Sequence, residues 1–245
     1  LSVNNRVEIG ESNPIWVSRY VFEFLICIFA IYGVKSIKSY STIAASLFIV
    51  FLSGSKGPIL AFLSSYLTIV NWKTRIFLCL GMIIFGIVGY YLLTLYLSED
   101  LLVFIEQRFF RLVPDGSSAD ILSERRDLIW ITALDRIYLN PTALFFGHGV
   151  GQSYQLLDIM PARYYPHNII IELLFENGLI TLIVFLILLL TAFLKSDLFI
   201  GLLVFHFVNA LFSGDIILNE KIFLFIGMSL FVPKGYNIFF NNRNC

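Results

Sequence analysis

Charged residues are scarce in this chain of 245 residues: they make up 14% of it, against about a quarter in soluble domains. Hydrophobic residues account for 58%, and the mean hydropathy is +0.83. The formal net charge is zero, so the chain has no overall basic field that would collect nucleic acid. These shortages exclude an ordinary soluble domain, a disordered tail and a nucleic-acid-binding protein. The composition is that of an integral membrane protein, whose first partner is the lipid bilayer.

Cysteine is also rare. Cys27 and Cys79 lie inside apolar stretches, and Cys245 is the last residue. Neither a metal-ligand spacing nor a disulfide framework is visible in this pattern. The sequence therefore predicts no metal site and no cofactor.

The chain consists largely of long apolar runs. A bilayer core about 30 Å thick requires about 20 helical residues. Seven runs qualify as candidate membrane spans, two of them forming a pair of short helices that meet at a turn: residues 15–34, 37–53, 58–71, 76–97, 168–194, 198–213 and 222–232. The predicted fold class is all-α, a polytopic bundle of transmembrane helices.

Lysine and arginine near the span ends predict the orientation, because positive residues beside spans stay on the cytoplasmic side. They occupy every second connection, as Lys35, Lys38, Lys73, Arg75, Lys195, Lys234 and Arg243. The alternate connections then face outward: the turn at 53–58, the long stretch 98–166 and the segment 214–221. We expect three regions: transmembrane helices in 1–97, a large outer loop in 98–166, and further transmembrane helices in 167–245.

The outer loop 98–166 is too long and too apolar to be a simple connection. Helical spacing of apolar residues between Leu128 and Leu139 predicts a small, mostly helical cap. All six of its cations are arginines, and guanidinium groups suit phosphate oxygens: Arg108, Arg111, Arg125, Arg126, Arg136 and Arg163. Ion pairing with the nine acids of the loop is the simpler interpretation for any single arginine. For the set, we expect at least one anion site.

His167 follows Pro166 and begins an apolar span, so its imidazole is predicted to lie where the outer water meets the membrane. A histidine there can take a proton from a hydroxyl near neutral pH. The alternative is a residue that merely starts a helix, with Asn168 supplying local hydrogen bonds. From this histidine alone, the alternative is the simpler interpretation.

Other polar residues accompany His167. Glu172 and Glu176 lie one helical turn apart within the span and require polar partners there, such as loop backbone or an arginine. His148, among alternating glycines, is as consistent with a turn residue as with a ligand contact. His206 is expected to bond to a neighbouring helix. Lys56 lies in a glycine- and serine-rich turn that suits an anion, although a lysine reaching to the interface explains it equally well.

Several of these residues together resemble the O-antigen ligase and polymerase superfamily. The resemblance covers roughly residues 43–190 and rests on Arg126, Trp130, Ala133, Pro141, the segment from Gly147 to Gly151, Pro166, His167, Asn168, and the run Glu176, Asn177, Gly178, Leu179. The turn 53–58 resembles the family's Ser-Arg-Gly turn, with Lys56 in place of arginine; lysine keeps the charge but loses the bidentate fork. Family members usually have more spans, and the chain starts at Leu1 without a methionine, so we interpret it as a C-terminal fragment.

The resemblance implies a multi-pass enzyme of the bacterial inner membrane with a GT-C-like helical fold. Such an enzyme transfers sugar chains carried on undecaprenyl pyrophosphate on the periplasmic face, without a metal. It implies His167 as the group that activates the acceptor hydroxyl, and Arg126 and Lys56 as cations that hold the donor pyrophosphate. We add Arg163 because it lies just before His167, and we assign supporting roles to His148, Asn168 and Glu176.

The leading hypothesis is a Wzy-type polymerase that joins repeat units of O-antigen, capsule or exopolysaccharide. The nearest alternative is a ligase that moves the finished chain onto lipid A core or onto protein. A flippase and a chain-length regulator are the protein partners that this hypothesis implies. A reading from another class is a transporter for lipid-linked glycans, which an internal inverted repeat would favour; we find none.

Overall fold

Helices form the regular structure of the chain in a computed structural model that describes residues 14–32, 42, 46, 56–69, 76, 80, 91, 126–153, 165–196 and 199–232. No strand occurs within these residues. The chain divides into two compact units, one of residues 1–113 with 239–245 and one of residues 114–238. The all-α prediction is confirmed for the described residues, whereas the full set of membrane crossings stays a prediction.

The first unit contains two packed helices, α1 (Pro14–Tyr32) and α3 (Lys56–Ile69). The rings of Phe22 and Phe62 stack between them, with centroids 4.5 Å apart and planes 9° from parallel. Helix α3 begins two residues earlier than predicted, so Lys56 belongs to its first turn and not to a separate turn. Pro58 is compatible with this start because a proline in the first helical turn interrupts no hydrogen bond.

Two predicted spans and much of the outer loop fall outside the described residues. Within spans 37–53 and 76–97 only single helical positions are described, namely Thr42, Ser46, Ile76, Leu80 and Tyr91. Residues 98–125 and 154–164, which include Arg163, also lie outside the described part.

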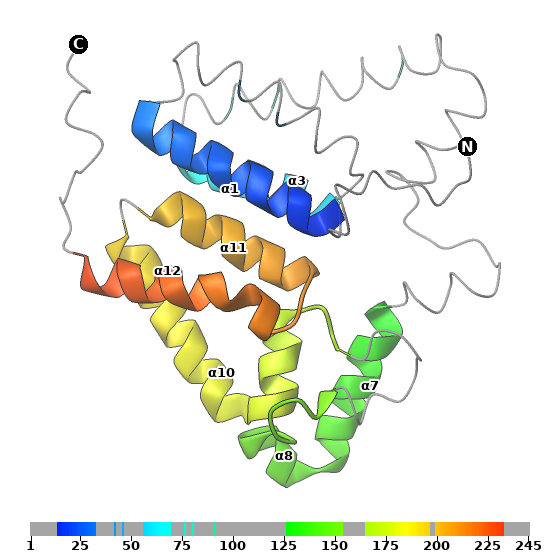
Figure 1. The fold of residues 1–245 in the computed structure, drawn as a ribbon. Helices are drawn as coiled ribbons and strands as arrows, with labels where there is room; N and C mark the ends of the chain where they lie inside the picture. Colours follow the sequence, from blue (N-terminus) through cyan, green and yellow to red (C-terminus); the bar gives the residue numbers. More distant parts are fainter. Residues whose placement is uncertain are drawn as a thin grey trace. The chain divides into compact units, whose positions relative to one another are not determined.

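The second unit contains the remaining helices (Figure 1). Their bounds are α7 Arg126–Leu139, α8 Pro141–Phe146, α10 Ile169–Lys195, α11 Ile200–Phe212, the 3-10 turn η2 Ile217–Asn219, and α12 Glu220–Phe231. Helix α7 confirms the predicted helical spacing between Leu128 and Leu139. The predicted runs 168–194, 198–213 and 222–232 are also helical, with bounds shifted by one or two residues.

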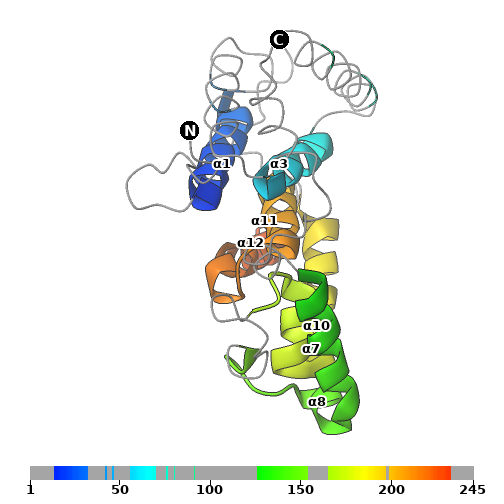
Figure 2. The ribbon, with the colours of Figure 1, turned by 90° about the vertical axis from the view of Figure 1, so that its right-hand side faces the viewer.

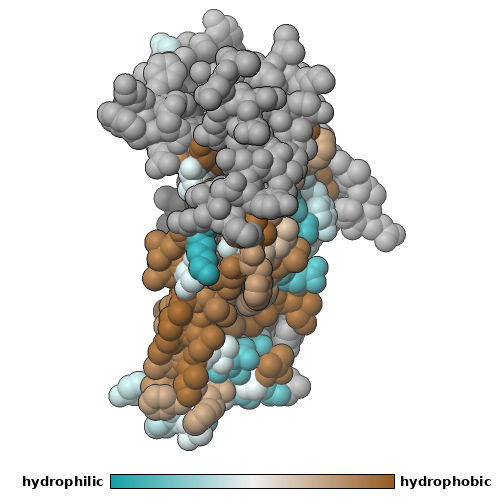
Figure 3. All heavy atoms as spheres, turned by 90° about the vertical axis from the view of Figure 1, so that its left-hand side faces the viewer, coloured by the Kyte–Doolittle hydropathy of each residue, from teal (hydrophilic) through white to brown (hydrophobic). Residues whose placement is uncertain are grey.

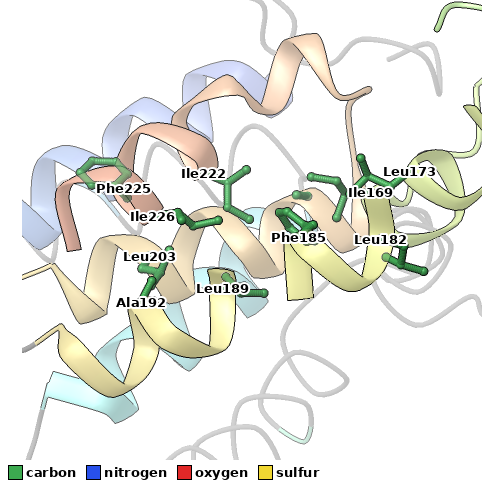
Figure 4. Packing of buried hydrophobic residues seen from close by; sticks show 11 residues of the cluster. Ile169, Leu173, Leu182, Phe185, Leu189, Ala192, Leu203, Ile222, Phe225 and Ile226 are labelled. Carbon is green, nitrogen blue, oxygen red and sulfur yellow. The ribbon is translucent and has the colours of Figure 1, made fainter. Parts of the chain in front are cut away.

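Two apolar clusters hold this unit together. The larger joins α10, α11 and α12 (Figure 4) through Ile169, Leu173, Leu182, Phe185, Leu189, Ala192, Leu203, Ala210, Ile222, Phe225 and Ile226. The smaller joins α7 to α10 through Ile129, Ala133, Ile137 and Phe175. Figures 1 and 2 both show α7 and α8 lying alongside the first part of α10. The start of α10 is therefore packed on two sides.

Helix α10 is broken at Gly178, which the sequence analysis did not predict. Gly178 has φ 78° and ψ 177°, far from helical values. Before it, residues 169–177 are buried or half-buried; after it, eight large apolar side chains between Ile180 and Leu194 are 41% to 67% exposed. The break therefore separates a part that faces protein from a part that presents an apolar surface.

Helix α10 is also the one described helix long and apolar enough to cross a membrane. Its exposed segment, residues 179–195, is about 25 Å long at about 1.5 Å per residue, close to the hydrocarbon thickness of about 30 Å. The shorter apolar helices are Gly57–Ile69 and Ile200–Phe212. The first part of α10 turns back at Gly178 toward the connection between α11 and α12 (Figure 1), so the exposed segment alone has the length and composition of a membrane-facing helix.

Candidate functional site

His167 lies immediately before the cap of α10 and is 7% exposed. Its φ of 55° makes it the one non-glycine residue with a positive φ in the described part of the chain. Left-handed backbone disfavours residues with a Cβ, although His and Asn adopt it more readily than most. A buried histidine in this conformation requires support from its neighbours, and the structure provides that support on both sides.

Asn168 supplies the support on the helix side. Its side-chain oxygen accepts hydrogen bonds from the backbone N–H groups of Ile170 and Ile171 at 3.0 and 3.3 Å. These bonds satisfy two of the N–H groups that a helix start leaves without partners. Asn168 therefore fixes where α10 begins and hence where His167 lies.

Trp130 of α7 supplies the support on the other side. Its indole N–H donates to the backbone carbonyl of Pro166 at 2.7 Å. The ring of Tyr165 lies against the imidazole of His167, with centroids 4.0 Å apart. His167 directly follows Pro166, so its backbone is restrained by this bond. The bond joins two residues that lie 36 positions apart in the sequence.

Trp130→Phe is expected to loosen this restraint while keeping an aromatic ring in place. The lost hydrogen bond is worth about 1 kcal/mol. We expect a lower Tm in detergent and a reduced activity of the full-length protein. Trp16→Phe in α1 is the matched control, because it makes the same chemical change where the ring contacts Arg19. Equal losses of activity in the two variants would contradict a role for the Trp130 hydrogen bond.

The turn after α8 is bonded to the break in α10. His148 donates its backbone N–H to the carbonyl of Phe175 at 2.8 Å, and Gly149 donates to the carbonyl of Glu176 at 2.9 Å. The His148 ring stacks on the Phe175 ring at 4.5 Å, with Nδ1 3.3 Å from the Phe175 carbonyl. Non-helical backbone at Gly178 prevents the regular helical pattern at these carbonyls, so the turn supplies the donors. For His148 these contacts favour the turn-residue interpretation.

Two glycines allow this approach of backbone to backbone. Gly147 ends α8 with φ 75°, and a Cβ there would lie 2.2 Å from the carbonyl oxygen of Glu176. A Cβ on Gly178 would lie 2.3 Å from the carbonyl oxygen of Phe145. No other residue provides both the positive φ and the missing Cβ. Gly147 and Gly178 therefore form a glycine contact that joins α8 to the break in α10.

Glu176 fastens the end of the same turn. Its carboxylate accepts hydrogen bonds from the hydroxyl and the backbone N–H of Ser153, at 2.5 and 3.2 Å, and both residues are buried. Of the two partners expected from the sequence, loop backbone and an arginine, the structure places loop backbone here, together with the Ser153 hydroxyl. Glu176 thus has a positioning function in the fold.

Substitutions at this pair are expected to follow an order. Glu176→Gln keeps a side-chain oxygen that can accept both bonds, so its losses of stability and activity should be small. Ser153→Ala removes one donor at a cost of about 1 kcal/mol, and Glu176→Ala leaves two buried donors unpaired at a cost of about 2 to 4 kcal/mol. Tm and activity should fall together in that order. Activity as low in Glu176→Gln as in Glu176→Ala would instead assign chemistry to the carboxylate.

Glu172 points to another part of the same unit. One carboxylate oxygen accepts the backbone N–H of Ile216 at 3.1 Å, in the connection between α11 and α12. Among the described residues the other oxygen is buried without a hydrogen-bond partner, and the charges of Glu176 and Asp215 repel the carboxylate. Asp215 caps the next turn through Leu218 N–H at 2.7 Å. Glu172 thereby ties the α11–α12 connection to the start of α10.

The structure brings together some of the predicted site residues. His167 and Asn168 lie at the start of α10, whereas the turn that contains His148 bonds to Phe175 and Glu176, just before the break at Gly178. The side chains of Lys56 and Arg126 and the whole of Arg163 lie outside the described residues. Their assignment to the pyrophosphate stays a prediction. Arg136, the loop arginine whose side chain is described, is exposed on α7.

Sequence reasoning missed three features of the site: the Trp130 bond to Pro166, the break at Gly178 and the partner Ser153. Asn177-Gly178 inside an apolar run was a signal for the break, because glycine is costly in a helix interior unless backbone geometry requires it. Within the described residues, no group of three His, Cys, Asp or Glu side chains is placed to hold a metal ion.

These features define a helical protein in which a buried histidine precedes a broken helix of membrane-spanning length and is held by the α7–α8 hairpin. Residues 41–186, more than half of the chain, match the O-antigen ligase family, and the chain belongs to that family. No curated protein and no solved structure matched the chain in the comparisons. The resemblance noted in the sequence is therefore confirmed at the level of the family. The chain is an O-antigen ligase- or polymerase-like membrane enzyme.

Proposed function

We propose that the protein polymerises oligosaccharide repeat units carried on undecaprenyl pyrophosphate, at the outer face of the bacterial inner membrane. One observation carries the proposal: His167 is buried at the start of a membrane helix and held on both sides, by Asn168 and by the Trp130 bond to Pro166. A general base must be held within hydrogen-bond reach of the hydroxyl that it deprotonates, and this support meets the requirement for fixed placement.

In the proposed reaction, the imidazole of His167 removes the proton from a hydroxyl of the acceptor sugar. The hydroxyl oxygen forms a bond to the anomeric carbon of the donor sugar. The bond between that carbon and the pyrophosphate oxygen breaks, and its electron pair leaves with the lipid pyrophosphate. The proton ends on His167 and returns to water after the product departs.

The leaving pyrophosphate gains negative charge, which fixed cations stabilise. We assign this role to Arg126, Lys56 and Arg163 on the strength of their sequence positions. Arg126 is the first residue of α7, the helix that also carries Trp130. Lys56 is the first residue of α3, where backbone N–H groups at a helix start add to the attraction for an anion.

The polymerase hypothesis is tested with defined lipid-linked repeat units added to membranes that contain the full-length protein. A polymerase extends the glycan on the lipid that already carries it, so the products form a ladder of lipid-linked chains. Transfer of the glycan to lipid A core or to a protein, without a ladder, would assign ligase activity. Movement of intact substrate across the membrane without a new bond would assign transport and overturn the proposal.

A further inference from the structure

The end of the α7–α8 hairpin carries a group of exposed apolar side chains. Five residues form this tip patch, and each is 48% to 86% exposed: Tyr138, Leu139, Phe145, Phe146 and Val150. They come from the last turn of α7, the last turn of α8 and the glycine-rich turn that follows. Monomeric proteins rarely expose such a concentration of large apolar groups to water, so the patch requires an explanation.

The tip patch adjoins the lipid-facing part of α10. The carbonyl of Phe145 lies against Gly178, where a Cβ would approach it to 2.3 Å. The exposed apolar segment of α10 begins two residues later, at Ile180. Figure 3 shows a hydrophobic surface that covers one face of this unit and reaches toward the end formed by α8. The patch therefore borders the exposed apolar segment of α10, which has the length and composition of a membrane-facing helix.

We propose that the tip patch inserts into the outer leaflet of the bilayer, so that α8 lies in the membrane interface. Aromatic side chains concentrate in this interfacial layer, and short apolar helices can lie within it. The glycine contact supports this placement, because it fixes α8 beside Gly178, and the exposed apolar segment of α10 begins just after that residue. Arg136, exposed in the last turn of α7, is positioned to meet lipid phosphate groups.

Insertion gives the hairpin a mechanical role. Helix α7 supplies the Trp130 bond that restrains Pro166 and His167. Anchoring the far end of the α7–α8 hairpin in lipid would hold that bond at a constant depth. Lipid-linked substrates also enter from the outer leaflet, so the patch would keep His167 at the level of their pyrophosphate. This second consequence rests on the proposed function, whereas insertion itself does not.

Spin labels on the full-length protein in phospholipid nanodiscs test the insertion. Single cysteines replace Phe146 and Val150 in the patch, Ile187 on the lipid-facing part of α10 and Asp135 on the exposed face of α7, after Cys27, Cys79 and Cys245 are changed to alanine. Collision rates with oxygen, which concentrates in lipid, are compared with those with a water-soluble nickel chelate.

Labels at 146 and 150 are expected to show an oxygen-to-nickel ratio several-fold higher than that of the label at 135. The label at 187 should also show a ratio above that of the label at 135. Ratios equal to that at 135 would place the patch in water and overturn the proposal. Spin–spin broadening that disappears on dilution with unlabelled protein would assign the patch to a second copy of the chain, which also overturns it. Because no step uses substrate, failure here leaves the proposed transfer reaction unaffected.

Discussion

Gly178→Ala is expected to prevent the protein from reaching its folded state in normal amounts. The new Cβ would lie 2.3 Å from the Phe145 carbonyl oxygen and 2.6 Å from the Gly147 nitrogen, both of them backbone atoms that no side-chain rotation can move away. The positive φ of 78° adds strain. Together these effects should lower the free energy of unfolding by about 4 kcal/mol or more, the range of severe core disruptions. Gly147→Ala should behave alike, because its Cβ meets the Glu176 carbonyl at 2.2 Å.

Two other glycines provide matched controls. Gly151 also has a positive φ, of 78°, but a Cβ there meets nothing within 4 Å, so Gly151→Ala isolates the backbone strain, about 1 to 2 kcal/mol. Gly227 lies in α12 with open space around it, and Gly227→Ala should be neutral or stabilising by up to about 1 kcal/mol. Membrane abundance and Tm in detergent measure the series. Wild-type values for Gly178→Ala and Gly147→Ala would show that α8 is not held against the break.

His167→Asn is expected to lower glycan transfer by about 10²- to 10⁴-fold, the usual contribution of a general base. Asparagine is the informative replacement because it tolerates the left-handed backbone that His167 adopts. His167→Ala removes the same imidazole but adds about 1 kcal/mol of strain. Near-wild-type Tm with lost transfer in His167→Asn would therefore separate chemistry from folding. The measurement is the initial rate of transfer from lipid-linked repeat units in membranes.

Imidazole added to His167→Gly provides a second readout. Glycine accepts the positive φ and leaves a space the size of the missing ring, so free imidazole is expected to restore part of the transfer. Added imidazole should not restore transfer in His148→Gly. The His148 ring packs on Phe175, and we expect this variant to lose the packing of the turn and not a chemical group. Near-wild-type transfer in His167→Asn would remove His167 from the catalytic role.

The sequence predicted the helices well and their interruptions poorly. Runs such as 168–194 are apolar enough that helix and membrane placement follow from composition alone. The break at Gly178 depends on a tertiary contact with Gly147, thirty-one residues earlier, which no local pattern in α10 specifies. The start of α3 at Lys56 differs from the predicted turn because proline is as compatible with a third helical position as with a first.

For the candidate site, the sequence indicated which residues to consider but not the backbone contacts that hold them. His167 was chosen because of the family resemblance, with Asn168, His148 and Glu176 as supporting residues, and the structure gives Asn168 and Glu176 specific hydrogen bonds. The indole bond from Trp130 to Pro166 was not predictable, since the acceptor is a backbone carbonyl and any residue has one. The positive φ of His167 was not predictable either, because histidine adopts left-handed backbone only occasionally. Features carried by backbone geometry are those that sequence reasoning could not supply.

Surface polysaccharide from a strain whose chromosomal gene carries His167→Asn tests the central claim most directly, with membrane abundance of the protein measured in parallel. We expect the protein at its normal level and the ladder of polymer lengths reduced to a single repeat unit. A ladder of normal length and intensity, made by a normally abundant variant, would contradict both the polymerase function and the role of His167.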